Sequence, residues 1–229
     1  TNVDSLQGKF GHHVVLLAQK ADDPTPPGTV YDCSKMTNFE PFAIPLNAIP
    51  AGYGTALPSG KKLIIQFHYL NAGELPLLVR DVIRLKKMPV ADVQKWMSVY
   101  ATNEVGFEVP PRAADHKVSF DCTLPVDVEL LAFGGHMHEW GSKFKAELGE
   151  ANGPMTELYT VSKWTADYRD SPPISLFQSA PKQLKKDTVL RTTCEWNNDT
   201  DRALTFPEEM CATFGLVAGV MDPVVCTVG

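Results

Sequence analysis

Histidine and methionine are the residues of this chain whose types and spacing could do chemistry. Five of its six histidines fall into three places along the sequence, at His12-His13, at His68 and at His136-Met137-His138. Met210 lies downstream in the string Glu-Glu-Met-Cys. Neutral imidazoles suit zinc, copper, iron or nickel, but a set that adds a thioether to two imidazoles is soft, and softness selects copper(I). These residues therefore predict two chemically different copper sites.

Each cluster also has an ordinary structural explanation when it is taken alone. A His-x-His pair on a strand puts both rings on one face, which suits a metal but is more often a polar pair on a sheet surface. Adjacent His12 and His13 point to opposite faces of a regular strand, so sharing one metal requires a bulge or a strand end. His68 could be a core histidine bonded to a carbonyl, and Met210 could fill the core. His116, in a polar stretch, is assigned to a solvated loop.

The elements that must position these residues are expected to be strands. Short runs rich in β-branched and aromatic residues are separated by many of the 18 prolines and 16 glycines, at intervals typical of sandwiches. Strands are expected at residues 14–17, 62–69, 128–133 and 188–194. The one helix-like stretch runs from Val90 to Met97, after the domain junction expected near Pro89. Residues 21–28, with three prolines, are expected to form a surface loop. The sequence thus predicts an all-β fold.

Length and charge exclude several classes of protein. A chain of 229 residues that is 44% apolar can bury a core in one large or two modest domains. Lys and Arg number 21 against 27 Asp and Glu, which gives a net charge of −6 with no basic block, so no nucleic-acid partner is expected. The most apolar runs, such as Phe214 to Val220, are far shorter than the ~20 residues that span a bilayer, so no membrane span is expected.

The cysteines indicate the compartment. The chain has five cysteines and no Cys-x-x-Cys spacing, which favours disulfides over a zinc ribbon or a thioredoxin site. Disulfides in turn favour an oxidising compartment, so the protein is expected to be secreted, vesicular or periplasmic. The sequon Asn198-Asp199-Thr200 is compatible with secretion. An odd number of cysteines leaves one thiol over.

The order of the motifs, taken together, resembles a known family. Gly-His12-His13-Val-Val-Leu-Leu is followed by Gln66-Phe-His68-Tyr69, by Gly-His136-Met-His138, by Cys194, by Glu208-Glu209-Met210-Cys211 and by Cys226. This order, which covers nearly the whole chain, is similar to that of the copper type II, ascorbate-dependent monooxygenases. Dopamine β-hydroxylase and the peptidylglycine α-hydroxylating monooxygenase belong to that family.

The resemblance implies two antiparallel β-sandwich domains of jelly-roll type, an electron-transfer domain over residues 1–89 and a catalytic domain over residues 90–229. It implies that the first domain binds one copper through His12, His13 and His68, with Gln66 close by. It implies that the second domain binds the copper that meets dioxygen through His136, His138 and Met210. The disulfides that it implies are Cys122–Cys226 and Cys194–Cys211, with Cys33 left unpaired.

The activity that the resemblance implies is hydroxylation of a C–H bond of a small molecule. It uses dioxygen, two coppers per chain, and ascorbate or another one-electron donor. The peptide-amidating member holds its substrate's carboxylate with an arginine, an asparagine and a tyrosine. Gly134, Ala212 and Phe214 stand at those positions here. Since none of them offers a carboxylate a cation or a hydroxyl donor, peptidyl-glycine is not the expected substrate.

Other functions stay open beside this one. The same ligands could serve a non-catalytic copper-binding or electron-transfer module of a larger assembly. A zinc hydrolase is disfavoured because methionine is a poor zinc ligand and only Glu139 lies beside the His-x-His as a general base. Eleven residues precede His12, fewer than in the family's first domain. Either that domain is pared down or its opening strands are missing, and the unpaired Cys33 favours an upstream segment or partner.

Overall fold

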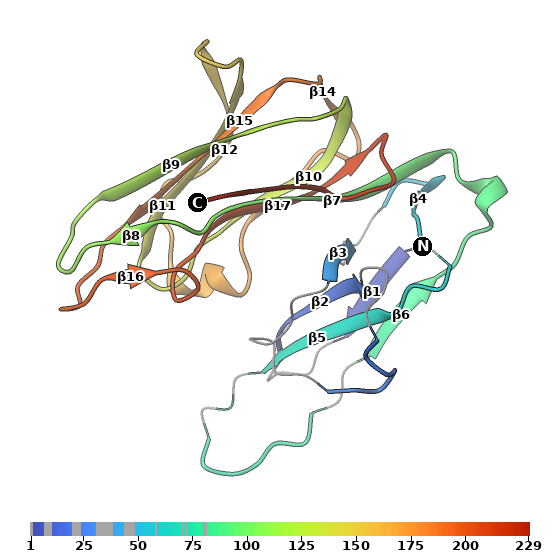
Figure 1. The fold of residues 1–229 in the computed structure, drawn as a ribbon, viewed down its shortest axis with the longest axis horizontal. Helices are drawn as coiled ribbons and strands as arrows, with labels where there is room; N and C mark the ends of the chain where they lie inside the picture. The colour runs from blue at the N-terminus through green and yellow to red at the C-terminus, as the bar shows by residue number, and fades with distance from the viewer. Residues whose placement is uncertain are drawn as a thin grey trace. The chain divides into compact units, whose positions relative to one another are not determined.

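The computed structural model describes the backbone of most of the chain (Figure 1). The described residues are 2–6, 11–19, 24–30, 39–43, 49–57, 59–69, 71, 73–79 and 82–229. Strands dominate them, and their helical segments are two short 3-10 turns, η2 (Val90–Asp92) and η3 (Ala166–Arg169). The predicted all-β fold is confirmed. Within this part of the chain, no helix has the length and hydrophobicity that a bilayer crossing requires.

The chain forms two compact units. Unit 1 comprises residues 1–99 and 220–223, and unit 2 comprises residues 100–219 and 224–229. The division falls inside strand β7 (Lys95–Glu104), beyond the junction expected near Pro89. The domains 1–89 and 90–229 therefore stay a prediction.

Unit 1 contains small sheets of short strands. β3 (Phe39–Ala43), β2 (Gly11–Gln19) and β5 (Leu63–Tyr69) form an antiparallel sheet in that order. β1 (Asn2–Leu6) pairs with β6 (Val82–Lys86), and β4 (Tyr53–Thr55) pairs in parallel with the start of β7. Leu16 and Ala18 of β2 are buried, and apolar residues of β5 and β6 pack against them. Leu16 and Ala18, on one face of β2, thus contribute to the core of this unit, and the intervening Leu17 is buried as well.

Unit 2 is built from two larger sheets. The first has the order β13 (Ile174–Leu176), β10 (Val128–His136), β17 (Cys211–Ala218), β7 and β18 (Val224–Val228), with β14 (Lys182–Leu184) also paired with β10. The second has the order β12 (Met155–Val161), β11 (Gly141–Gly149), β15 (Val189–Trp196) and β9 (His116–Thr123). A short ribbon pairs β8 (Glu108–Val109) with β16 (Leu204–Thr205). β18 runs parallel to β7, which departs from the antiparallel sandwich expected.

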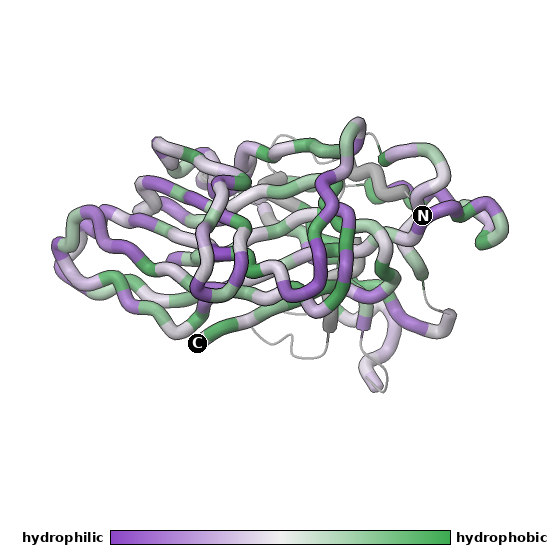
Figure 2. Tube along the Cα trace, turned by 90° about the horizontal axis from the view of Figure 1, so that it is seen from above, coloured by the Kyte–Doolittle hydropathy of each residue, from purple (hydrophilic) through white to green (hydrophobic). Residues whose placement is uncertain are grey.

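Residues of both sheets form the core of unit 2. Phe133 of β10 and Phe144 of β11 are fully buried. Each meets Tyr159 of β12 edge to face, with ring centroids 5.6 and 5.8 Å apart. Figure 2 shows hydrophilic and hydrophobic residues interspersed along the chain. Buried and half-buried residues alternate along most of β15, as in a strand with one face toward the core.

Two disulfides join the two sheets of unit 2. Cys122 of β9 is bonded to Cys226 of β18, and Cys194 of β15 is bonded to Cys211 of β17. These are the pairings that the family resemblance implies. They favour an oxidising, extracellular compartment. The fifth cysteine, Cys33, lies outside the described residues.

The four expected strands are present within β2, β5, β10 and β15, but two local predictions are wrong. The helix expected over residues 90–97 is a single 3-10 turn followed by β7 from Lys95. Pairing with β4 draws this segment into a sheet, where Met97 is 1% exposed, and such burial outweighs a weak helical pattern. His116 is not in a loop either. It is the half-buried first residue of β9, where it pairs with Trp196 of β15.

Candidate metal centre

The first predicted ligand set lies on two paired strands of unit 1. His12 and His13 belong to β2 and His68 belongs to β5, and the backbone register pairs His13 with His68. The register shifts between Gly11 and His13, which is the kind of irregularity that adjacent histidines need if they are to share a metal. The side chains of the three histidines lie outside the described part of the structure, so this ligand set stays a prediction.

Gln66, expected near the first copper, is a half-buried residue of β5. Its backbone pairs with Val15, two positions along the ladder from the His13–His68 pair. Among the described residues, it lines a cavity of about 500 Å³ together with Phe67 and Tyr69. Its role beside a copper stays a prediction.

In the second predicted set, the two imidazoles come together. His136 is the last residue of β10, and His138 follows just beyond the strand's end. Their Nε2 atoms are 3.2 Å apart, and the rings lie 5.0 Å apart between centroids at an angle of 85°. Both rings are half-buried. First-row metal ions take imidazole nitrogens at about 2.0–2.1 Å, so two Nε2 atoms at this spacing suit a shared ion.

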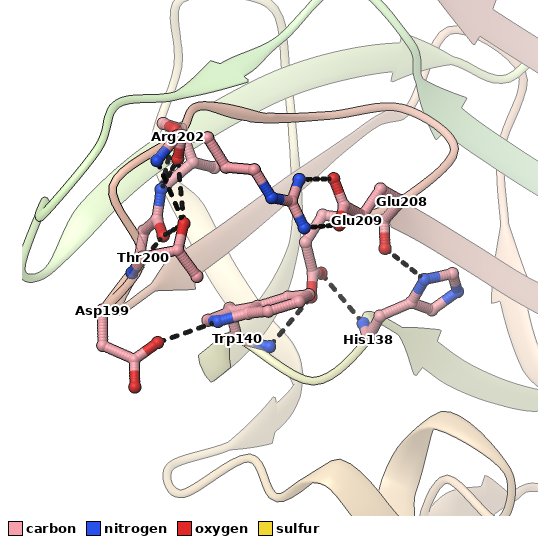
Figure 3. Close-up of polar contacts among 9 residues, drawn as sticks. His138, Trp140, Asp199, Thr200, Arg202, Glu208 and Glu209 are labelled. Carbon is pink, nitrogen blue, oxygen red and sulfur yellow. Dashed lines mark hydrogen bonds and ion pairs between the residues drawn. The ribbon is translucent and has the colours of Figure 1, made fainter.

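A backbone carbonyl fixes which nitrogen of His138 is available. Nδ1 of His138 lies 2.8 Å from the carbonyl oxygen of Glu208, as Figure 3 shows. A carbonyl only accepts hydrogen bonds, so Nδ1 carries the proton and the lone pair of neutral His138 is on Nε2. That nitrogen is the one that faces His136. This arrangement is typical of metal-binding histidines, whose second nitrogen donates to a carbonyl or carboxylate.

Met210 is brought to the same end of the sheet. It immediately precedes β17, and the register of β17 with β10 pairs Ala212 with His136. Met210 is half-buried, whereas the next residue, Cys211, is fully buried in its disulfide. Among the side chains that the structure describes, no group of three or more His, Cys, Asp and Glu is placed to hold a metal. The Met210 thioether as a third ligand beside His136 and His138 stays a prediction.

Glu209 is a site residue whose role the sequence did not reveal. Its side chain is fully buried, and the four described hydrogen bonds to its carboxylate all come from N–H donors. Oε2 accepts from the backbone N–H of His138 at 3.0 Å, from the indole N–H of Trp196 at 2.9 Å and from the backbone N–H of Met210 at 3.4 Å. Oε1 accepts from the backbone N–H of Trp140 at 2.9 Å. Burial raises the pKa of the Glu209 carboxyl, while hydrogen bonds from Trp140, His138 and Trp196 lower it in part.

A polar layer surrounds this buried carboxylate. Arg202 forms a two-pronged ion pair with Glu208, and its guanidinium lies 6.0 Å from the centre of the Trp140 ring (Figure 3). The Trp140 indole N–H donates to Asp199 at 3.0 Å. The hydrogen bond from Arg202 lowers the pKa of the Glu208 carboxyl. Through these contacts with Trp140, the segment from Asp199 to Glu209 packs against the turn that follows His138.

The base of the same segment is anchored by Asn198, the sequon residue. Asn198 is 2% exposed, and its amide N–H groups lie 3.3, 2.9 and 2.8 Å from the carbonyl oxygens of Val109, Pro110 and Arg202. Its side-chain oxygen accepts from the backbone N–H and the hydroxyl of Thr200. The amide nitrogen that glycosylation would modify is thus buried and engaged, so the sequon gives no support for secretion.

The expected substrate-pocket residues lie next to His136 on one face of the sheet. The register pairs Gly134 with Phe214 and His136 with Ala212. Phe133 packs into the core, so Gly134 and His136, which alternate with it, face the other way. The Phe214 ring covers Gly134, because a Cβ added there would be 2.8 Å from Phe214 Cζ. This face is uncharged at all three positions, while the enclosure of a substrate there stays a prediction.

Comparisons with known proteins identify no family for this arrangement. No protein-family model and no curated protein matches the chain. Among solved structures, one titled "Structure of infectious bursal disease virus Gx strain" is similar at 10% identity, over 94% of this chain, with a TM-score of 0.27. The alignment spans 54% of that chain, about half its length. A likeness this weak carries no argument about function.

Proposed function

We propose that this chain is a copper-dependent monooxygenase that hydroxylates a C–H bond with dioxygen and a reductant such as ascorbate. The observation that supports this most directly is the convergence of the His136 and His138 Nε2 atoms at 3.2 Å, with the His138 tautomer set by the Glu208 carbonyl. Met210 at the adjoining start of β17 would complete a soft ligand set.

In this reaction the residues of the chain would bind the copper ions and orient the substrate. His136, His138 and Met210 would hold one copper, and His12, His13 and His68 the other. Copper supplies the one-electron chemistry that dioxygen needs before it can react with a C–H bond. The uncharged face at Gly134, Ala212 and Phe214 would orient a neutral or apolar substrate beside His136.

The arrangement also weighs against a zinc hydrolase. Glu139, the carboxylate next to the His-x-His, forms an ion pair with Arg169. A general base must be able to reach the water that it activates, and an engaged carboxylate is less suited to that task. Redox chemistry therefore remains the proposed activity of this site, and the protein is proposed to be secreted, vesicular or periplasmic.

A copper count per chain, combined with an oxygen-uptake assay, tests the proposal. We expect two coppers per chain, with Met210→Ala weakening only the second, and ascorbate oxidation coupled to oxygen uptake when a neutral substrate is added. Binding of a single copper, or loss of both coppers in Met210→Ala, would contradict the two-site assignment.

A non-catalytic copper or electron-transfer module is the second candidate. It is favoured by Gly134, Ala212 and Phe214, which replace the substrate-binding residues of the peptide-amidating enzyme. Two bound coppers without substrate-dependent oxygen uptake, across a panel of neutral and apolar substrates, would select this function instead.

A further inference from the structure

Glu209 connects the two strands whose ends carry the proposed ligands of the second site. The backbone N–H groups of His138 and Met210 both donate to the same oxygen, Oε2, at 3.0 and 3.4 Å. One residue is on the segment after β10 and the other precedes β17. Glu209 itself directly precedes Met210, so the hydrogen bonds that its carboxylate accepts from the N–H groups of His138 and Trp140 join the Met210 segment to the turn after β10.

The number of donors determines which side chain can occupy this place. Four N–H groups point at the Glu209 carboxylate, three at Oε2 and one at Oε1. An ionised carboxylate only accepts, so it can satisfy all four donors. A glutamine has one accepting oxygen, and its NH₂ group would face at least one N–H. A buried donor left without an acceptor is costly, so the isosteric change should loosen the contact.

We infer that Glu209 is the positioning residue of the second metal site, holding His138 and Met210 at the spacing at which they bind copper. The inference rests on the proposed function, since it assumes that these residues bind copper. If Glu209 has this role, the backbone at His138 and Met210 is already in its metal-binding arrangement before copper binds. A carboxylate that touches neither the metal nor the substrate would set the affinity of the site.

The test is a chelator-competition titration of copper(I) on the full chain and on Glu209→Gln. Loss of a residue that supports a ligand typically costs ten- to a hundredfold in metal affinity. We therefore expect the second site of Glu209→Gln to bind copper(I) at least about tenfold more weakly. The matched control is Glu147→Gln, the same change at a half-buried carboxylate of β11 that pairs with Lys145. Its affinity should stay within about twofold of wild type.

X-ray absorption of the copper(I)-loaded proteins separates positioning from stability. A purely structural role would lower the unfolding temperature but leave the sulfur ligand of the folded protein in place. Under the inference, the sulfur contribution from Met210 decreases in Glu209→Gln and persists in Glu147→Gln. An unchanged sulfur signal together with unchanged affinity would overturn the inference and leave the proposed function standing.

Amide hydrogen exchange on the metal-free wild type provides a test that needs no variant to fold. The N–H groups of His138 and Met210 should already be protected before copper(I) is added. Free exchange that becomes slow only after copper binding would show that the metal, and not Glu209, orders the site. If His138→Ala leaves the copper stoichiometry of the wild type unchanged, the proposed function itself fails.

Discussion

At the residue scale, two hydrogen bonds orient His138, one from its ring and one from its backbone. Its Nδ1 donates to the Glu208 carbonyl, and its own N–H donates to the buried Glu209. The Glu208 side chain points instead to Arg202 at the surface. A substitution of the Glu208 side chain would thus leave the carbonyl that selects the His138 tautomer in place. The charge of residue 208 can therefore be changed without changing the tautomer of His138.

Asn198 provides a prediction at the same scale. Its buried amide is bonded to three carbonyls, so we expect no glycan at Asn198 when the protein is secreted from a eukaryotic host. We also expect Asn198→Ala to lower the free energy of unfolding by about 1–3 kcal/mol, because the buried partners lose their hydrogen bonds. Peptide mass spectrometry and denaturant unfolding measure the two effects. A glycan found at Asn198 in folded protein would contradict the buried placement of its side chain.

At the element scale, the two faces of β10 contact different parts of unit 2. Gly135 faces the core, where a Cβ would lie 2.5 Å from the Phe144 ring of the opposite sheet. Gly134 faces the other way, toward Phe214 of the neighbouring strand. Consecutive glycines thus let one strand end approach both a core ring and a surface ring. His136 comes directly after them.

The two glycines form a matched pair for a stability measurement. We expect Gly135→Ala to lower the free energy of unfolding by about 1–3 kcal/mol, since the Phe144 ring is fully buried and has little space to move. Gly134→Ala should cost less, because its closest contact is the tip of the half-buried Phe214 ring. Thermal or denaturant unfolding of both variants measures the difference. An equal loss of unfolding free energy in both variants would contradict this expectation, because it would mean that the Phe144 and Phe214 rings move aside equally easily.

The sequence predicted the strands better than the connections between them. Runs of β-branched residues identified β2, β5, β10 and β15, because alternating burial leaves a local signature. Residues 95–97 begin β7 and pair with β4, a contact that no local sequence pattern contains. Glu209 was visible as part of Glu-Glu-Met-Cys. Its burial depends on donors from residues 138, 140 and 196, which only the folded chain brings together.

At the scale of the whole molecule, the two proposed ligand sets belong to different units. His12, His13 and His68 are in unit 1, and His136, His138 and Met210 are in unit 2. The sheet of β3, β2 and β5, which carries the first set, lies wholly in unit 1, whereas β10 and β17, which lead to the second set, belong to unit 2. Metal binding at one set should therefore not depend on the other, whereas turnover would need both, because hydroxylation by dioxygen takes two electrons.

His13→Ala tests this division of labour. We expect it to keep copper at the second site and to keep substrate affinity, while steady-state hydroxylation collapses. Turnover beside infrared spectroscopy of a carbon monoxide adduct on the reduced protein measures the two properties separately. His138→Ala is the opposing control and should lose the adduct. Wild-type turnover by His13→Ala, or an adduct retained by His138→Ala, would favour the non-catalytic copper module.

The two disulfides differ in how far a reducing thiol can reach them. Cys194 and Cys211 are both fully buried, whereas Cys226 is half-buried opposite a buried Cys122. Thiol exchange requires direct attack on a sulfur atom, so accessibility controls its rate. We expect mild thiol treatment to open Cys122–Cys226 first, with Cys194–Cys211 following only when unit 2 unfolds, as timed alkylation and mass spectrometry would show. Cys194–Cys211, the disulfide beside Met210, would then remain intact after Cys122–Cys226 is reduced. Mild reduction would therefore loosen one crosslink between the sheets but leave intact the one at the end of the sheet where the metal is proposed to bind.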